Sequence, residues 1–309
     1  MHTAVETNSL SKVYKSNTEY KALDSLSICV PRGCIFGLLG PNGAGKSTFI
    51  NILAGLTIKT SGSVHVCGIN QDELPMKTRS LLGVMLQETT IDPFLSPRES
   101  LHIQAGLYGI PPEKRNVDET LDKLELLDKA DAYTRTLSGG MKRRLMLAKA
   151  IIHKPELLIL DEPSAGVDIA LRKKLWSFVK ELNNNGTTII LTTHYLEEAQ
   201  DMCEHIAIIN KGQLTTCQPT SQLMRSLNIN YLVVKPKKLE TDIPKSLSDN
   251  LDLDVSITKN KDLRIAYNTT KVNPVEVLNI LQQAQIEIQD FRTEDPKLED
   301  IFLHLTENA

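Results

Sequence analysis

The chain lacks the long apolar runs that a membrane-spanning helix requires. Nowhere in its 309 residues do about 18 apolar residues follow one another. No segment is therefore expected to cross a bilayer, and any role at a membrane has to come through a partner. The first residues, MHTAVE, have no charged region followed by an apolar one, so we do not expect a signal peptide.

Cysteine is scarce, and its spacing gives no sign of a disulfide framework or a metal site. The cysteines are Cys29, Cys34, Cys67, Cys203 and Cys217. None belongs to a C-x-x-C pair or has the spacing of metal ligands. An odd, scattered set of this kind is typical of reduced thiols in a cytosolic protein.

An excess of positive charge is also missing. The 35 Lys and Arg residues and 38 Asp and Glu residues give a formal net charge of −3, so no overall basic field predicts nucleic-acid binding. Hydrophobic residues make up 41% and charged residues 24%, which is ordinary for a globular protein. The length suits one large domain and a small one.

What the chain does contain is a predicted phosphate-binding loop. Residues 40–48, GPNGAGKST, fit the pattern G-x-x-x-x-G-K-[ST]. Glycine lets the backbone turn tightly and bring its N–H groups against anionic oxygens, and the N-terminus of a following helix favours negative charge. Lys46 can then reach the terminal phosphates of a nucleotide, and Ser47 can ligate Mg²⁺.

The neighbouring residues support this prediction. Residues 34–39 form an apolar run of strand length, and residues 48–56 are apolar with helical period. Strand, glycine loop and helix is the arrangement that the motif requires.

Polar side chains follow three further apolar segments. Gln87 follows residues 82–86, Asp161 and Glu162 end the segment that begins at residue 156, and His194 follows residues 187–193. Strands alternating with helices from about residue 33 to 205 predict a mostly parallel sheet. Because ligands bind at the carboxyl ends of such strands, these side chains are expected to gather near Lys46.

Each of these side chains suits phosphate chemistry. Gln87 can reach a bound ion or an attacking water, or it can simply form hydrogen bonds at the strand end. Asp161 suits Mg²⁺, and Glu162 is placed to polarise a water. His194 can contact a γ-phosphate, although a lone histidine is more often structural.

A second anion site is predicted in LSGGMKRRL, residues 137–145. Ser138, Gly139 and Gly140 offer free N–H groups, a hydroxyl and little side-chain bulk at the start of a helix. The cations at 142–144 lie in the first turn, where the helix dipole disfavours them, which suggests a nearby anion. The alternative is a solvated basic face.

Other segments complete the predicted architecture. Residues 5–30 are expected to form strands, including one over 25–30, and Tyr14 among them can stack on an adenine ring or be an ordinary strand aromatic. Ser96 begins a capping box that predicts a helix, within a helical insertion over about 88–136. The first domain is expected to span 1–220.

Beyond residue 220 the composition changes. Alternating apolar residues predict strands, and residues 274–284 and 296–303 predict helices, which gives a small α+β domain over 221–309. It carries no catalytic set of residues, so a role in regulation or dimerisation is the default expectation.

Taken in order, these motifs resemble those of the ATP-binding subunits of ATP-binding cassette (ABC) transporters, over residues 5–220. The resemblance pairs residues 40–48 with the Walker A motif, Gln87 with the Q-loop glutamine, 137–141 with the signature, 157–163 with Walker B, 164–168 with the D-loop, and His194 with the switch histidine. Tyr14 occupies the place of the adenine-stacking aromatic. The signature commonly ends in Gln, where this chain has Met141.

Three segments resemble one branch of that family, the ABC-2 type exporters: TTHYLEEAQ at 192–200, SGGMKRRL at 138–145 and DPKLEDIFLHLT at 295–306. In that branch a separate membrane subunit supplies the channel. The resemblance implies an α/β P-loop NTPase core with an antiparallel β subdomain and a helical insertion, followed by a small α+β domain. It also implies a place at the cytoplasmic face of the inner membrane, bound to the permease.

The resemblance implies a role for each site residue, with ATP and Mg²⁺ as cofactors and no nucleic-acid partner. Catalysis would rest on Glu162, His194 and Gln87, and Mg²⁺ would be held by Ser47, Gln87 and Asp161. ATP would bind to Tyr14, Gly40, Pro41, Asn42, Gly43, Ala44, Gly45, Lys46, Ser47 and Thr48 of one subunit, and to Ser138, Gly139 and Gly140 of a second identical subunit.

Two alternatives use the same ATP site without transport. One is a DNA-maintenance ATPase, but too few residues separate Gly40 from Asp161 to hold the long coiled coil of such proteins. The other is an ATPase that drives a soluble assembly partner, which the exporter-like residues 295–306 argue against.

Overall fold

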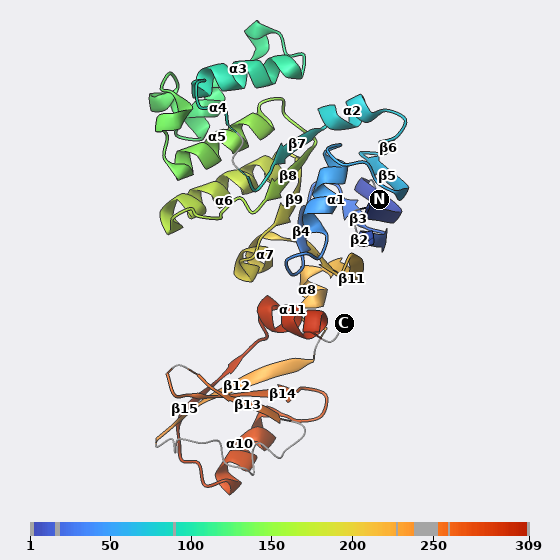
Figure 1. Cartoon of the computed structure of the whole chain (residues 1–309). Coiled ribbons are helices and arrows are strands. Elements are labelled where there is room, and N and C mark those ends of the chain that lie inside the picture. The colour runs from blue at the N-terminus through green and yellow to red at the C-terminus, as the bar shows by residue number, and fades with distance from the viewer. Residues whose placement is uncertain are drawn as a thin grey trace. The chain divides into compact units, whose positions relative to one another are not determined.

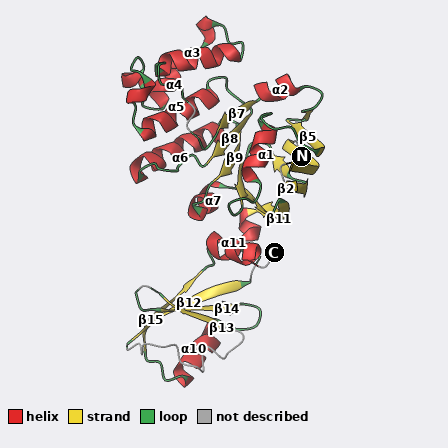
Figure 2. Ribbon diagram, viewed as in Figure 1, coloured by secondary structure: helices red, strands yellow, loops and turns green. Residues whose placement is uncertain are grey.

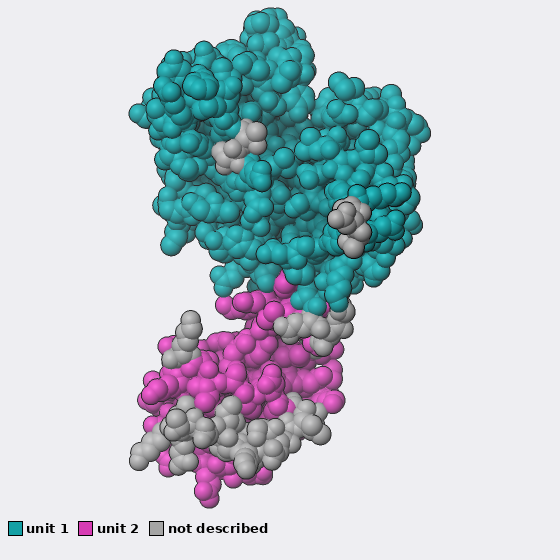
Figure 3. All heavy atoms as spheres, in the orientation of Figure 1, with its two compact units in different colours: residues 1–220, 306–309 teal, residues 221–305 magenta. Residues whose placement is uncertain are grey.

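The computed structural model describes residues 3–15, 19–88, 91–226, 228–237, 253–258 and 260–307 (Figure 1). The chain forms two compact units, residues 1–220 with 306–309 and residues 221–305 (Figure 3). The first unit holds every residue of the predicted ATP site.

A six-stranded sheet of order β11-β10-β4-β9-β8-β7 is the centre of the first unit. Its strands are parallel except for β11, which pairs antiparallel with β10. The parallel strands are continuous apolar runs because helices and a second sheet cover both faces. The strands are β4 Ile35–Leu39, β7 Leu82–Met85, β8 Leu157–Asp161, β9 Thr188–Thr192, β10 His205–Asn210 and β11 Gln213–Pro219.

Helix α1, Lys46–Leu53, begins where the glycine loop after β4 ends, and its apolar side chains hold that end of the loop against the core. Phe49, Ile50 and Leu53 are buried. Burying side chains of this size stabilises the fold by about 2 kcal/mol each. Further helices of the first unit are α2 Pro75–Ser80, α6 Ile169–Asn184 and α7 Leu196–Met202, and α8 Thr220–Leu223 begins at the last residue before the second unit.

A second, antiparallel sheet of order β2-β1-β5-β6, with β3 paired to β1, packs into the same core cluster as β4 and α1 (Figure 2). Its strands are β1 Thr3–Lys15, β2 Glu19–Leu26, β3 Cys29–Pro31, β5 Ser61–Val66 and β6 Ile69–Asn70.

The prediction of one strand over residues 25–30 is wrong. β2 ends at Leu26 and β3 begins at Cys29 because β1 changes its partner between them. Ile28 lies in the gap, where its backbone N–H donates to the Thr7 hydroxyl at 2.9 Å and its carbonyl accepts from the Thr7 backbone N–H at 2.9 Å.

The helical insertion gathers at the opposite end of the first unit from the antiparallel sheet (Figure 1). The predicted capping box of its first helix is confirmed: the Glu99 backbone N–H donates to the Ser96 hydroxyl at 3.2 Å, and the Ser96 N–H donates to the Glu99 carboxylate at 2.8 Å. The insertion contains α3 Pro97–Leu107 and α4 Val117–Lys123, with 3₁₀ turns at η1 Pro112–Lys114, η2 Leu127–Lys129 and η3 Thr134–Thr136, and α5 Gly139–Ile151 follows it.

An aromatic stack joins α3, α5 and the sheet. The ring of Tyr108, at the end of α3, lies parallel to the ring of His153, just after α5, with 3.6 Å between centroids. His153 Nε2 lies 2.9 Å from the Leu82 carbonyl of β7. Because a carbonyl only accepts, Nε2 carries the proton, and the buried Nδ1 has no hydrogen-bond partner among the described residues.

The second unit is an α+β module. Its sheet has the order β13-β14-β12-β15, and Leu232, Ile265, Val277 and Leu281 share one core cluster between the sheet and α10. The elements are β12 Ile229–Pro236, β13 Leu253–Ile257, β14 Leu263–Asn268, α10 Pro274–Gln283, β15 Ile288–Glu294 and α11 Leu298–Glu307.

The stack at His153 predicts an acid sensitivity. Burial lowers the pKa of His153 below its usual value, so the unfolded chain takes up a proton that the folded chain resists as the pH falls below about 6.5. The free energy of unfolding should decrease from about pH 7 to about pH 5, by up to roughly 1.4 kcal/mol per pH unit from this one group. Urea unfolding at a series of pH values measures it.

The variant His153→Phe keeps the stacked ring and removes the titration, so it should show a smaller decrease than the unaltered protein. The matched control is His102→Phe, at a half-buried position on α3. An unchanged pH dependence in His153→Phe would contradict the prediction.

Candidate functional site

Neighbouring backbone packs so closely against the glycine loop after β4 that only glycine fits at two positions of the loop. Gly45 has a φ of 106°, and a Cβ there would lie 2.5 Å from the Ala22 carbonyl oxygen. A Cβ at Gly40 would lie 2.2 Å from the Ile209 carbonyl oxygen. The turn between β10 and β11 also holds the loop, because the Gly212 N–H donates to the Ala44 carbonyl at 3.0 Å.

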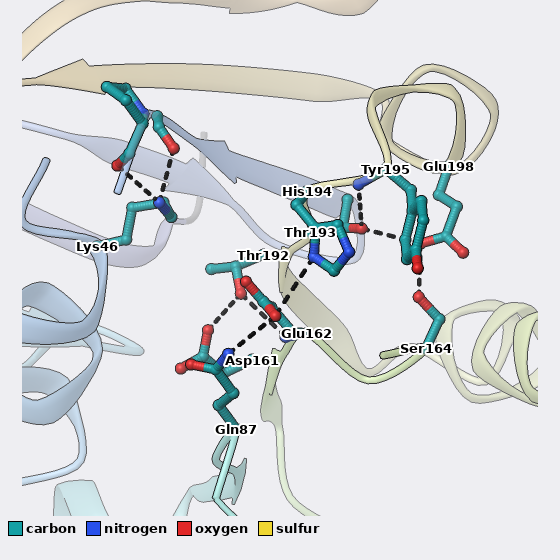
Figure 4. A network of polar contacts seen from close by, with 12 residues as sticks. Lys46, Gln87, Asp161, Glu162, Ser164, Thr192, Thr193, His194, Tyr195 and Glu198 are labelled. Atoms are coloured by element: carbon teal, nitrogen blue, oxygen red, sulfur yellow. Dashed lines mark hydrogen bonds and ion pairs between the residues drawn. The ribbon is translucent and has the colours of Figure 1, made fainter. Parts of the chain in front are cut away.

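The Lys46 side chain forms hydrogen bonds with the beginning of this loop. Its Nζ donates to the carbonyl oxygens of Gly40 at 2.7 Å and Pro41 at 3.1 Å (Figure 4). Burial lowers the pKa of Lys46, and the nearby carboxylates of Asp161 and Glu162 oppose that change. The ammonium group therefore lies at the mouth of the loop and within the field of both acids.

The pairing of β8 with β9 places Asp161 beside Thr192. The two residues are register partners at the carboxyl ends of their strands, and the Thr192 hydroxyl donates to the Asp161 carboxylate. Asp161 is 7% exposed. Burial raises its pKa, and the hydrogen bond from Thr192 opposes the change.

Glu162 contacts polar side chains from two neighbouring loops. Its Oε2 accepts from Gln87 Nε2 at 3.0 Å and lies 3.4 Å from His194 Nδ1 (Figure 4). Its backbone is left-handed, with a φ of 50°, which is uncommon for a residue other than glycine. The Glu162 N–H donates to the Thr192 carbonyl at 3.1 Å, which helps to hold this conformation.

The predicted side chains therefore meet at one edge of the sheet. Gln87, Glu162 and His194 are in direct contact, and Asp161 is joined to them through the strand end. What each one does to a nucleotide stays a prediction.

Arg143 on α5 has a structural task that sequence reasoning missed. It is buried, and its guanidinium donates to the carbonyl oxygens of Gln87 at 2.6 Å and of Glu162. Arg144 donates to the Leu124 carbonyl at 2.9 Å and also pairs with Glu125. Within the described residues the hydrogen bonds of Arg143 go to these two carbonyls, and the interpretation that the cations mark a ligand anion stays a prediction.

The second predicted anion site opens to solvent. Ser138 caps α5 by accepting from the Met141 N–H at 3.2 Å, and a Cβ at Gly139 would have nothing within 4 Å. In the part of the chain that the structure describes, no hydrogen bond links residues 138–140 to the loop at 40–48.

Tyr14 lies on β1 opposite Tyr20 of β2, is 39% exposed, and has Lys12 Nζ 4.8 Å from its ring centroid. Tyr20 makes the link to the glycine loop, because its hydroxyl donates to the Gly43 carbonyl at 3.1 Å. Nothing in the local sequence distinguished Tyr20 as a contact of the loop.

The donor set fits a nucleotide with a hard divalent cation. The loop offers backbone N–H groups and one ammonium to phosphates, and Ser47 and Asp161 offer oxygens of the kind that Mg²⁺ prefers. The Gln87 amide N–H₂ donates to Glu162, which leaves the amide oxygen as its ligating atom. Fold and site together define a P-loop NTPase of the α/β class.

Comparison with known proteins agrees. The profile of the family described as ABC transporter matches residues 23–165. The chain is 34% identical over 308 residues to the daunorubicin/doxorubicin resistance ATP-binding protein DrrA of Streptomyces peucetius, covering 98% of this chain and 92% of that protein. It is 33% identical over 298 residues to the Nod factor export ATP-binding protein I of Paraburkholderia xenovorans, covering 96% and 95%.

A solved structure is similar too. It is a dimeric ATP-binding cassette in a post-hydrolysis state, bound to ADP and Pi, with a TM-score of 0.64 and 27% identity over 70% of this chain and 98% of that one. The chain therefore belongs to the ABC transporter family, among the ATP-binding subunits of its ABC-2 type exporters, and it is an ATPase.

Within the described residues, no helix combines the length and the apolar character needed to cross a bilayer.

The position of Lys46 predicts a loss of nucleotide affinity on its removal. Lys46→Ala deletes the ammonium at the mouth of the glycine loop, so ATP should bind at least about tenfold more weakly, which corresponds to about 1.4 kcal/mol. Titration with a fluorescent ATP analogue measures this, with the exposed Lys129→Ala as the matched control. Equal affinities in the two variants would contradict the phosphate role.

Proposed function

We propose that this ATPase powers export through a separate ABC-2 type membrane subunit, and that two copies of the chain close on ATP·Mg²⁺. One observation carries the mechanism: Gln87 and His194 converge on Glu162 at the sheet edge near Lys46, while Ser138 and Gly139 are exposed to solvent. The first group supplies most of a hydrolytic site, and the second would complete the site of another subunit.

Nucleotide binding would use the glycine loop of one subunit. The N–H groups of residues 40–48 would surround the β-phosphate, and Lys46 would exchange its two carbonyl partners for β- and γ-phosphate oxygens. Ser47, Asp161 and the Gln87 amide oxygen would hold Mg²⁺. A bound cation favours the ionised form of Asp161, against the effect of its burial.

Hydrolysis would depend on Glu162. Its carboxylate, held by Gln87 and near His194, is placed to orient a water for in-line attack and to accept its proton. His194 would donate a hydrogen bond to the γ-phosphate. Mg²⁺ supplies charge neutralisation when bound, and the protein groups supply position.

The signature residues would act across a dimer. Ser138, Gly139 and Gly140 form the open N-terminus of α5, a 13-residue helix, and would grip the γ-phosphate bound to the partner subunit. Support comes from the solved cassette that is similar to this chain, which is a dimer with ADP and Pi. ATP would join two subunits, and hydrolysis would release them.

Export is supported by the relatives, since one is named for drug resistance and another for export of Nod factor. We infer that a permease anchors this chain at the cytoplasmic face of the inner membrane and determines which molecule is moved. The rival functions, in DNA maintenance or soluble assembly, have no such support from the names of these two relatives.

Co-purification tests the proposed partner. A tagged copy, isolated from its native membranes in mild detergent, should bring along one integral membrane protein at about a one-to-one ratio, identified by mass spectrometry. Lys46→Ala is the matched variant, because a chain with a weakened ATP site should still capture the permease. Recovery of soluble proteins or nucleic acid alone would contradict export.

A further inference from the structure

A carboxylate outside the predicted catalytic set connects the loops of the site. Glu198 lies on α7 and bonds to three other segments. Its Oε2 accepts from the Ser164 hydroxyl at 2.7 Å and from the Thr193 hydroxyl at 2.9 Å. Its Oε1 accepts from Trp176 Nε1 at 3.2 Å and lies 3.5 Å from Arg172 Nε.

These contacts engage most of the carboxylate. Of its about four acceptor positions, three accept the hydrogen bonds from Ser164, Thr193 and Trp176, and Arg172 adds an ion pair to Oε1. The Glu198 side chain is only 9% exposed, and Ser164 and Thr193 are buried. Hydrogen bonds to a charged, desolvated acceptor are stronger than those between neutral groups, so the arrangement is well defined.

The two hydroxyl donors belong to the loops that carry the catalytic candidates. Ser164 is two residues after Glu162, and Thr193 directly precedes His194. The Thr193 hydroxyl also accepts from the Tyr195 N–H at 3.0 Å, so the residues on both sides of His194 are held (Figure 4).

Packing strengthens the same connection. The Tyr195 ring lies 4.1 Å from the His194 ring, centroid to centroid. The Arg172 guanidinium forms an ion pair with Glu198 and also lies 4.5 Å from the centroid of the Tyr195 ring. Helix α6 therefore supports the histidine loop through the same carboxylate.

We propose that Glu198 is a positioning residue for ATP hydrolysis. It ties the loop after β8 to the loop after β9, so that His194 and Glu162 keep the 3.4 Å approach that the reaction uses. This inference rests on the proposed function, because it assigns Glu198 a part in the same hydrolytic site.

The connection serves turnover and not nucleotide binding. In the described part of the chain, the partners of Glu198 are Ser164, Thr193, Trp176 and Arg172, and none belongs to the glycine loop. Loss of the carboxylate should therefore leave the phosphate cradle intact while the two loops lose their common anchor.

The test uses Glu198→Gln in the full chain. The amide has the same size, but its N–H₂ group replaces one of the two acceptor oxygens. That group then faces either the Ser164 and Thr193 hydroxyls or the N–H donors on α6, and it cannot accept their hydrogen bonds. We expect kcat to fall by about tenfold or more while the Kd for ATP changes by less than about threefold. Asp201→Asn, an exposed carboxylate on the same helix, is the matched control and should leave both values unchanged.

A double-variant cycle separates positioning from general damage. If Glu198 acts through Glu162 and His194, adding Glu198→Gln to Glu162→Gln should lower the remaining single-turnover rate far less than it lowers that of the unaltered protein. Equal fold losses in the two backgrounds would overturn the proposal. So would an unchanged kcat, or a loss of ATP binding that matches the loss of kcat.

A second pair of variants covers the case in which Glu198→Gln does not fold. Thr193→Val removes one donor to the carboxylate, whereas Thr193→Ser keeps it, so only the valine variant should lose kcat strongly at similar ATP affinity. Equal kcat values in this pair would overturn the proposal. If instead the unaltered protein and Glu162→Gln hydrolyse ATP at the same rate, it is the proposed function that fails.

Discussion

The parallel pairing of β8 with β9 is the constraint on which the site depends. Its register sets Asp161 beside Thr192 and brings the loops that follow both strands to one edge of the sheet. β4 pairs with β9 on the other side, so the glycine loop begins at the same edge. Because the strands are buried apolar runs on both faces, a slip in register would disturb the packing of their side chains as well as separate the polar residues.

Charge and hydrogen bonds then fix the loops that the sheet brings together. Lys46 is held by carbonyls of its own loop, and Arg143 by carbonyls of Gln87 and Glu162. Glu198 binds the hydroxyls on the far side. Each of these charged groups is at least partly buried and forms hydrogen bonds with the loops, which holds the loops in position before a nucleotide binds.

The parts predicted from sequence are those with local signals. The spacing of apolar residues and the glycine motif predicted the strand, glycine loop and helix at 34–56, and a local motif predicted the capping box at Ser96. The positions of Gln87, Glu162 and His194 after predicted strands indicated that these side chains meet. The contacts of Tyr20, Arg143 and Glu198 join segments far apart in the chain, and no local pattern encodes such pairs. The break in the strand at Ile28 was missed for the same reason, since it depends on where β1 changes partners.

The central claim is that ATP joins two copies of this chain, bound between the glycine loop of one copy and residues 138–140 of the other. Sedimentation velocity on Glu162→Gln, with ATP and Mg²⁺, tests it most directly, because slowed hydrolysis should let the joined state accumulate. The account predicts a dimer with ATP, a monomer with ADP, and a monomer with ATP when Ser138→Arg is added. A monomer with ATP in Glu162→Gln, together with normal hydrolysis, would contradict it.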